Sequence, residues 1–156
     1  SVGKLSIATE HVASNVAQSL VKIISDNHKK SKLDKGKLII TTPVGEDHCI
    51  SCNVLESLLL SKGFTTFNIS PSTPAESLIQ FVKTVRPTAI LISITLDDNI
   101  KSGQRLAKKI HDAYKKLPIF VGGQAFLNNT RSKFDATLIE NTRQLDQIPR
   151  ILTKKQ

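Results

Sequence analysis

The sequence is poor in the residues that would place it in several common classes of protein. It has no tryptophan, no methionine, one tyrosine and two cysteines. Two cysteines cannot build a disulfide framework, and so few aromatic rings leave little on which nucleic-acid bases could stack. No stretch approaches the roughly 20 apolar residues that cross a bilayer, and no secretory signal peptide opens the chain. We therefore expect a cytoplasmic protein without a membrane partner.

Several motifs that bind phosphates or carry catalysis are also missing. No Walker-type loop and no G-x-G-x-x-G follows the first apolar run of the main domain, so nucleotide and dinucleotide binding lack their signature. The G-x-S-x-G nucleophile elbow is absent as well. Because the chain shows no complete catalytic site for a substrate, we expect a binding module rather than an enzyme.

The chain carries a formal net charge of +9 over 156 residues, of which 39% are apolar and 22% charged. Such a composition is ordinary for a globular domain. A polyanion such as nucleic acid would suit the excess of positive charge. The lysines, however, gather at residues 29–37, at the C-terminal ends of predicted helices and in the tail, where they complement helix dipoles and favour solubility. We favour this solvated-surface interpretation and keep nucleic acid as a minor alternative.

Apolar residues recur with a helical period first and in short runs afterwards. Val12, Val16, Leu20 and Ile23 form a stripe that predicts a helix over residues 7–27, followed by a polar linker. Beyond the linker, apolar runs predict strands at 38–40, 64–69, 89–94, 119–121 and 136–139. The amphipathic segments between them predict helices at 53–62, between Pro74 and Pro87, at 99–116 and at about 143–152.

The predicted strands are apolar on both faces, which is typical of a parallel sheet covered by helices on both sides. Right-handed crossovers then favour an α/β, flavodoxin-like (Rossmann-like) five-stranded parallel sheet of order 2-1-3-4-5, preceded by an N-terminal helical segment. In such sheets ligands bind beyond the carboxyl ends of the strands, next to the first strand. The topology therefore selects three loops, at residues 42–51, 93–98 and 122–127.

The first of these loops contains an imidazole, with a carboxylate two residues before it and a hydroxyl three residues after it. These are His48, Glu46 and Ser51. A histidine that binds metal usually donates its second ring N–H to a carboxylate, which fixes the tautomer and raises the basicity of the ligand nitrogen. Glu46 could accept that hydrogen bond, and Ser51 could extend the relay. The alternative is that Glu46 and Asp47 favour a helix N-terminus beside a solvated histidine.

All three loops resemble the motifs of one known family. The run GEDHCIS at 45–51 resembles the Asp-x-His-x-x-Gly signature of cobalamin-binding domains, with Glu46 in place of Asp and Ser51 in place of Gly. The run LISIT at 91–95 is similar to the family's Ser-x-Leu/Thr strand end, and VGG at 121–123 to its Gly-Gly loop. The similarity extends over roughly residues 36–152, so we expect a cobalamin-binding domain at 36–156.

The resemblance implies base-off, His-on binding, in which His48 coordinates cobalt and the displaced nucleotide tail enters a cleft beside the first strand. A glycine lets backbone approach the tail closely, and a hydroxyl at a strand end can bond it. Each feature alone could also be an ordinary turn or strand end. The expected metal ligand is His48, and the expected cofactor-binding residues are Glu10, His11, Gly45, Glu46, Asp47, His48, Ser51, Ser93, Ile94, Thr95, Gly122 and Gly123.

The N-terminal helix narrows the resemblance further. The run LSIATEHVAS at 5–14 is similar to the Glu-His end of the helical segment that caps cobalamin in light-dependent MerR-type transcriptional regulators. Residues 1–30 would then be the C-terminal part of that cap, with Glu10 and His11 toward the upper side of the corrin. Helix-surface positions for both are the alternative. The likeness to methionine synthase and corrinoid methyltransferase proteins is more distant.

The resemblance implies a sensor or transcriptional regulator that responds to cobalamin or light, with adenosylcobalamin or methylcobalamin as cofactor. It would act on DNA only through a domain absent from this chain, and a homo-oligomer is one option. A corrinoid carrier for methyl transfer, serving as the corrinoid subunit of a methyltransferase, is the first alternative. The second is a thioredoxin-like redox protein, because CISC at 49–52 is a C-x-x-C. A zinc site at His48, Cys49 and Cys52 would lack a fourth protein ligand, and small apolar filler would also explain both cysteines.

Overall fold

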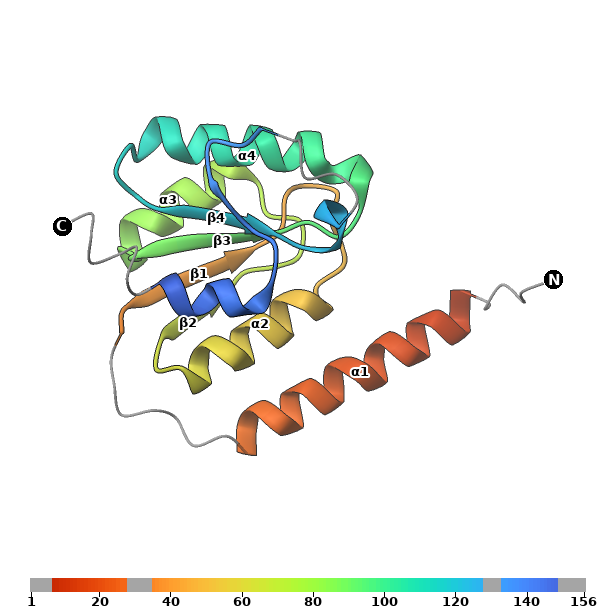
Figure 1. The fold of residues 1–156 in the computed structure, drawn as a ribbon. Helices are drawn as coiled ribbons and strands as arrows, with labels where there is room; N and C mark the ends of the chain where they lie inside the picture. The colour runs from red at the N-terminus through yellow and green to blue at the C-terminus, as the bar shows by residue number, and fades with distance from the viewer. Residues whose placement is uncertain (1–6, 28–34, 128–132, 149–156) are drawn as a thin grey trace.

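The structure is a computed structural model that describes residues 7–27, 35–127 and 133–148. Its core is a parallel sheet of order β2-β1-β3-β4-β5, as the sequence predicts. Helices cover both faces of this sheet, and the chain enters through a long N-terminal helix (Figure 1). The strands are β1 (Lys37–Thr41), β2 (Thr65–Asn68), β3 (Ala89–Ser93), β4 (Ile119–Gly122) and β5 (Thr137–Ile139). The α-helices are α1 (Ile7–Asn27), α2 (Ile50–Ser61), α3 (Ala75–Val85) and α4 (Ile100–Ala113).

The strands are buried on both faces because their alternate side chains enter two separate cores. Ile39 and Ile90 pack with the apolar faces of α3 and α4. Leu38 and Leu91 point the other way, into a core shared with α2 and with the 3-10 helix η3 (Thr142–Gln147). Removing this apolar surface from water is the main stabilising contribution to the sandwich.

Two predicted elements differ from the structure. The helix expected at 53–62 begins three residues earlier, because the N–H of Asn53 already bonds the Cys49 carbonyl at 3.0 Å. Ser51 and Cys52 therefore lie on α2 and not in a loop. The helix expected at about 143–152 is instead the short η3, opened by the Asn141 side chain, which accepts the Arg143 N–H at 3.1 Å. The last part of that predicted helix lies outside the described residues.

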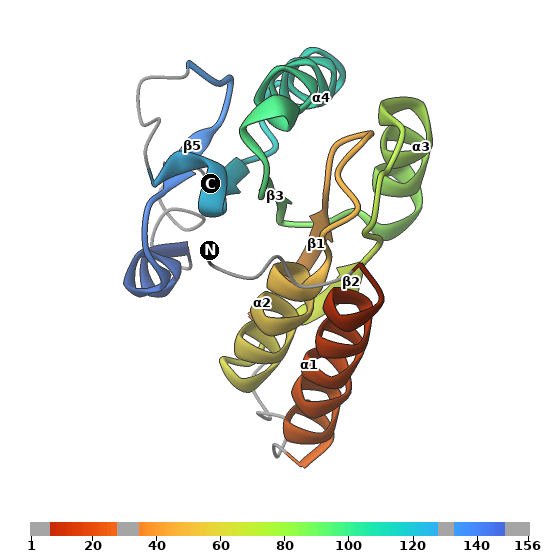
Figure 2. The same cartoon turned by 90° about the vertical axis from the view of Figure 1, so that its right-hand side faces the viewer.

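Helix α1 forms where the sequence predicts it and lies alongside α2 in both views of the fold (Figures 1 and 2). Its predicted stripe is exposed, since Val12, Val16, Leu20 and Ile23 keep 53–63% of their surface in contact with solvent. Helix α1 contacts α2 through a different face, which contains Gln18, whose side-chain amide donates to Cys49 Sγ at 3.6 Å. Within the described residues, no helix is long and apolar enough to span a membrane.

Candidate B12 site

The loop after β1 is a tight, braced turn at the carboxyl edge of the sheet. The Thr42 hydroxyl donates to the Glu46 carbonyl at 2.9 Å and accepts the Ser72 N–H at 2.7 Å. Gly45 has φ +90°, a left-handed conformation that glycine adopts without steric cost. These bonds turn the chain so that the Glu46 side chain points into the protein while His48 stays at the surface.

Glu46 and His48 form the central pair of the site. His48 Nδ1 lies 2.8 Å from Glu46 Oε1, and the backbone N–H of His48 donates to the same oxygen at 3.2 Å. The Glu46 side chain is fully buried, whereas the His48 side chain is 50% exposed. An imidazole held in this way carries its proton on Nδ1, and its Nε2 is left as a lone-pair donor.

The second carboxylate oxygen of Glu46 is saturated by donors from the segment after β3. Oε2 accepts the Thr95 N–H at 2.9 Å, the Leu96 N–H at 3.0 Å and the Asn99 side-chain amide at 3.0 Å. Burial alone would raise the pKa of Glu46, but the hydrogen bonds from Leu96, Asn99, Thr95 and His48 outweigh it and lower the pKa below its ordinary value of 4.5. The carboxylate is therefore ionised at neutral pH. Its negative charge next to Nδ1 raises the basicity of the imidazole Nε2.

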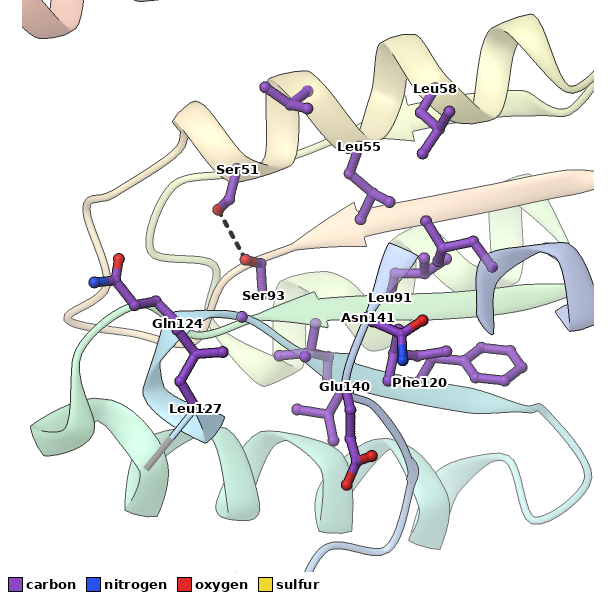
Figure 3. Close-up of a pocket in the computed structure, with 17 residues that line it drawn as sticks. Ser51, Leu55, Leu58, Leu91, Ser93, Phe120, Gln124, Leu127, Glu140 and Asn141 are labelled. Atoms are coloured by element: carbon purple, nitrogen blue, oxygen red, sulfur yellow. Dashed lines mark hydrogen bonds between the residues drawn. The ribbon is translucent and has the colours of Figure 1, made fainter. Parts of the chain in front are cut away.

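A cleft of about 400 Å³ opens on the α2 side of the sheet, and its lining begins at Ser51, three residues after His48. One wall is α2, the floor is formed by the ends of β3 and β4, and β5 with η3 closes the far side (Figure 3). The lining is mostly apolar and comprises Ser51, Val54, Leu55, Leu58, Leu91, Ile92, Ser93, Phe120, Val121, Gly122, Gly123, Gln124, Leu127, Ile139, Glu140, Asn141 and Leu145.

Ser51 and Ser93 meet at the mouth of the cleft, where their hydroxyl oxygens are 2.9 Å apart (Figure 3). This pairing differs from the expected relay, because Ser51 bonds Ser93 and not Glu46 or His48. The physical reason is the early start of α2, which holds Ser51 over the end of β3.

Gly122 and Gly123 lie at the end of the floor strand, and both are needed there for steric reasons. A Cβ on Gly123 would collide with the Ile94 carbonyl oxygen, and Gly123 has φ +124°. A Cβ on Gly122 would stand 2.8 Å from the Ile139 carbonyl oxygen. The pair thus allows β4 to pass close to its neighbours while leaving the cleft open.

The sequence matches the model of one family, the B12 binding domain, over residues 36–142. The chain belongs to the B12-binding domain family. Cobalamin is its cofactor. Comparison with curated protein sequences yields no match.

Solved structures of corrinoid proteins share the fold of this B12-binding domain. The methanol:cobalamin methyltransferase complex MtaBC from Methanosarcina barkeri matches with 17% identity and a TM-score of 0.62, over 96% of this chain and 57% of that chain. The Methanosarcina barkeri monomethylamine corrinoid protein matches with 15% identity and a TM-score of 0.68, over 92% of this chain and 67% of that chain. A cobalamin-binding protein from Desulfitobacterium hafniense DCB-2 matches with 19% identity and a TM-score of 0.62, over 92% and 68%.

These identities show the fold alone, and this chain spans only 57% of the MtaBC chain. None of the three structures is described as a transcriptional regulator, so they give no support to the narrower MerR-type expectation. Glu10 and His11, which carried that expectation, fall on α1, but their side chains lie outside the described part of the structure.

The other residues predicted to bind the cofactor differ in where the structure of the B12-binding domain places them. Ile94 is fully buried in the core, and Thr95 contributes its backbone N–H to Glu46 and does not line the cleft. Asp47 is exposed. Sequence reasoning missed Asn99, whose amide also donates to the Gly45 carbonyl at 3.2 Å. An asparagine before a helix is so common as a cap that only the fold reveals this partner.

The two cysteines do not form a reactive pair in this domain. Cys52 is fully buried, and burial raises the pKa of its thiol to about 11. A thiol with that pKa is protonated at neutral pH and is a poor nucleophile. Among the described residues, no three His, Cys, Asp or Glu side chains are grouped as a metal site, so a zinc site at His48 with both cysteines finds no support there.

Proposed function

We propose that this B12-binding domain holds cobalamin in the base-off form, with His48 as the protein ligand to cobalt. The observation that carries the proposal is the Glu46–His48 pair: a buried, ionised carboxylate 2.8 Å from Nδ1 of a half-exposed imidazole. Metal-binding histidines commonly have this arrangement, since the carboxylate fixes the tautomer and raises the basicity of Nε2. A solvent-exposed histidine that binds nothing would not require a buried carboxylate as its hydrogen-bond partner.

The cleft beside His48 suits the nucleotide tail that the histidine displaces. Its apolar walls match the apolar face of the cofactor's dimethylbenzimidazole, and its volume of about 400 Å³ is that of a small-molecule pocket. The Ser51 and Ser93 hydroxyls stand at the mouth, where the polar ribose-phosphate would pass. Backbone near Gly123 can approach the tail closely because no side chain intervenes. In this proposal Gly45 and Asp47 line the approach to His48, and Ile94 and Thr95 act through their backbone.

We further propose that the domain is a corrinoid carrier and presents the cofactor to partner enzymes for methyl transfer. Bound cobalamin supplies a cobalt centre that accepts and donates a methyl group. The chain contributes His48 to hold the metal, Glu46 to fix the imidazole and the cleft to retain the tail. Support comes from two neighbours of the same fold whose names describe a methyltransferase complex and a monomethylamine corrinoid protein. Methylcobalamin is the form that such a role requires.

Absorption spectra of the purified protein with hydroxo-, methyl- and adenosylcobalamin test the ligand. We expect the spectrum to shift from the base-on to the His-ligated form, and His48→Ala to lose the shift and retain cobalamin at least tenfold less well. His111→Ala, on α4, is the matched control and should behave as the wild type. An unchanged spectrum in His48→Ala would remove the assignment.

Carrier and sensor roles are separated by illumination. A light sensor changes its oligomeric state when the upper group of adenosylcobalamin is lost, whereas a carrier has no such requirement. We expect the same elution volume from a sizing column in the dark and after illumination. A light-dependent change in elution would contradict the carrier role and favour the regulator.

A further inference from the structure

The inner part of the cleft contains apolar side chains almost exclusively. Leu55 and Leu58 point down from α2 toward the sheet, and Leu91 and Phe120 form the floor beneath them (Figure 3). Leu91 and Phe120 are 3% and 1% exposed, and Leu145 of η3 at the side is 3% exposed. None of these five side chains can accept or donate a hydrogen bond.

The polar side chains of the cleft are at its rim or already paired. Gln124, Glu140 and Asn141 are exposed. Asn141 uses its carbonyl oxygen to cap η3. Ser93 is buried, but its hydroxyl is bonded to that of Ser51 at 2.9 Å. Along the described part of the lining, a ligand inserted between Leu58 and Phe120 therefore meets no side-chain partner for a polar edge.

We infer that this cleft selects corrinoids by the polarity of their lower base, taking a methylated benzimidazole and discriminating against a purine. The inference rests on the proposed insertion of the nucleotide tail. Both bases are flat bicyclic rings of similar size, so a cleft of about 400 Å³ does not separate them by volume. Polarity separates them, because the far ring of dimethylbenzimidazole carries only methyl groups.

Adenine has two ring nitrogens where dimethylbenzimidazole has ring carbons, and an exocyclic amine where dimethylbenzimidazole has only hydrogen. Each of these groups is hydrogen-bonded in water and would lose its partner between Leu55, Leu58 and Phe120. A polar group buried without a partner costs free energy, and a factor of ten in affinity corresponds to about 1.4 kcal/mol. We therefore expect the adenine-containing corrinoid to bind at least about tenfold more weakly than cobalamin.

Competition binding to the full chain tests this selectivity. Three probes are used: cobalamin, the corrinoid with adenine as lower base, and cobinamide, which lacks the nucleotide. Their dissociation constants are measured from the absorbance change on His ligation. Tight cobalamin binding with weaker adenine-corrinoid binding is the expected result. Equal affinity for the two complete corrinoids overturns the selectivity while leaving the proposed function intact. Failure of cobalamin to bind, or binding with an unshifted spectrum, overturns the proposed function itself.

A pair of variants at one position assigns the selectivity to the inner wall. Leu58→Gln adds an amide within the cleft. We expect it to lower the affinity for cobalamin and raise the affinity for the adenine-containing corrinoid, so that the ratio of the two affinities moves toward one. Leu58→Met keeps the wall apolar and should keep the wild-type ratio. Leu20→Gln, on α1 and outside the cleft, where Leu20 is 54% exposed, is the control and should also keep the wild-type ratio. The ratio of two affinities in one variant is insensitive to a partial loss of folded protein, and an unchanged ratio in Leu58→Gln contradicts the role of this wall.

Discussion

The Glu46 carboxylate links His48 by hydrogen bonds to the segment that follows β3. One oxygen accepts the imidazole Nδ1–H at 2.8 Å, and the other is bonded by three donors from the segment that follows β3. The orientation of a surface histidine is thus controlled from a segment about fifty residues further along the chain. A ligand oriented in advance loses less conformational freedom on binding.

Replacing Glu46 by Gln should weaken His ligation of cobalamin. Glutamine has nearly the same shape but no charge, and its amide opposes one of the N–H donors that now converge on the carboxylate. Changes in such supporting residues typically cost 10–100-fold in metal affinity. We expect a loss of about tenfold, measured by titrating cobalamin and following the His-ligated absorbance. Glu76→Gln, which removes an exposed carboxylate on α3 away from the cleft, is the control, and equal losses in the two variants would contradict the specific role of Glu46.

Asn99 should contribute to stability through the same carboxylate. Asn99→Ala removes the side-chain donor to Glu46 and to the Gly45 carbonyl. A hydrogen bond to a charged group contributes about 1.5–3 kcal/mol, so we expect urea denaturation to show a loss of about 2 kcal/mol. Asn99→Asp should be worse than Asn99→Ala, because it places a second carboxylate against Glu46. A free energy of unfolding equal to that of the wild type in both variants would contradict this bonding.

The pH dependence of stability should follow from the lowered pKa of Glu46. A carboxyl whose folded-state pKa lies below its unfolded value of about 4.5 contributes stability above that value and loses it as the pH falls through the folded pKa. Urea unfolding between about pH 7 and pH 3 should therefore show a steeper loss for the wild type than for Glu46→Gln, which cannot titrate there. Parallel curves for the two proteins would argue against an ionised, hydrogen-bonded Glu46.

The two glycines at close approaches to Ile94 should respond differently to alanine. At Gly123 the new Cβ would meet the Ile94 backbone in a left-handed conformation, so Gly123→Ala should cost about 3 kcal/mol. At Gly103, on α4, the Cβ would meet side-chain atoms and no backbone, first the terminal Cδ1 of Ile94, and alanine favours a helix. We expect thermal denaturation to show the larger loss for Gly123→Ala, and the reverse order would refute the close approach at the floor strand.

Thiol labelling of the native protein should separate the two cysteines. Cys52 is fully buried with a pKa of about 11, whereas Cys49 is partly exposed at the start of α2. A maleimide should label Cys49 within minutes and Cys52 only after denaturation, as mass spectrometry of each peptide will show. Labelling of both at similar rates, or reduction of a small disulfide by the protein, would restore the redox interpretation.

Much of the fold could be predicted from the sequence, because strands that are buried on both faces of the sheet consist of continuous apolar runs such as 89–94. Strand order followed from parallel pairing and crossover handedness. The start of α2 could not be read in the same way, since its first turn contains Ser51 and Cys52 and has no apolar period. The pairing of Glu46 with His48 was visible as local spacing. The Asn99 contact and the Ser51–Ser93 pair depend on how distant loops approach one another, which the local sequence does not contain.

The most direct test of the central claim is electron paramagnetic resonance of the cobalt(II) form bound to protein labelled with ¹⁵N at histidine only. The axial nitrogen splits each cobalt line, into three when it is ¹⁴N and into two when it is ¹⁵N. We predict that histidine labelling converts triplets to doublets and that His48→Ala removes the doublets. Triplets that persist in the labelled protein would mean that the benzimidazole still coordinates cobalt, and would contradict His48 as the ligand.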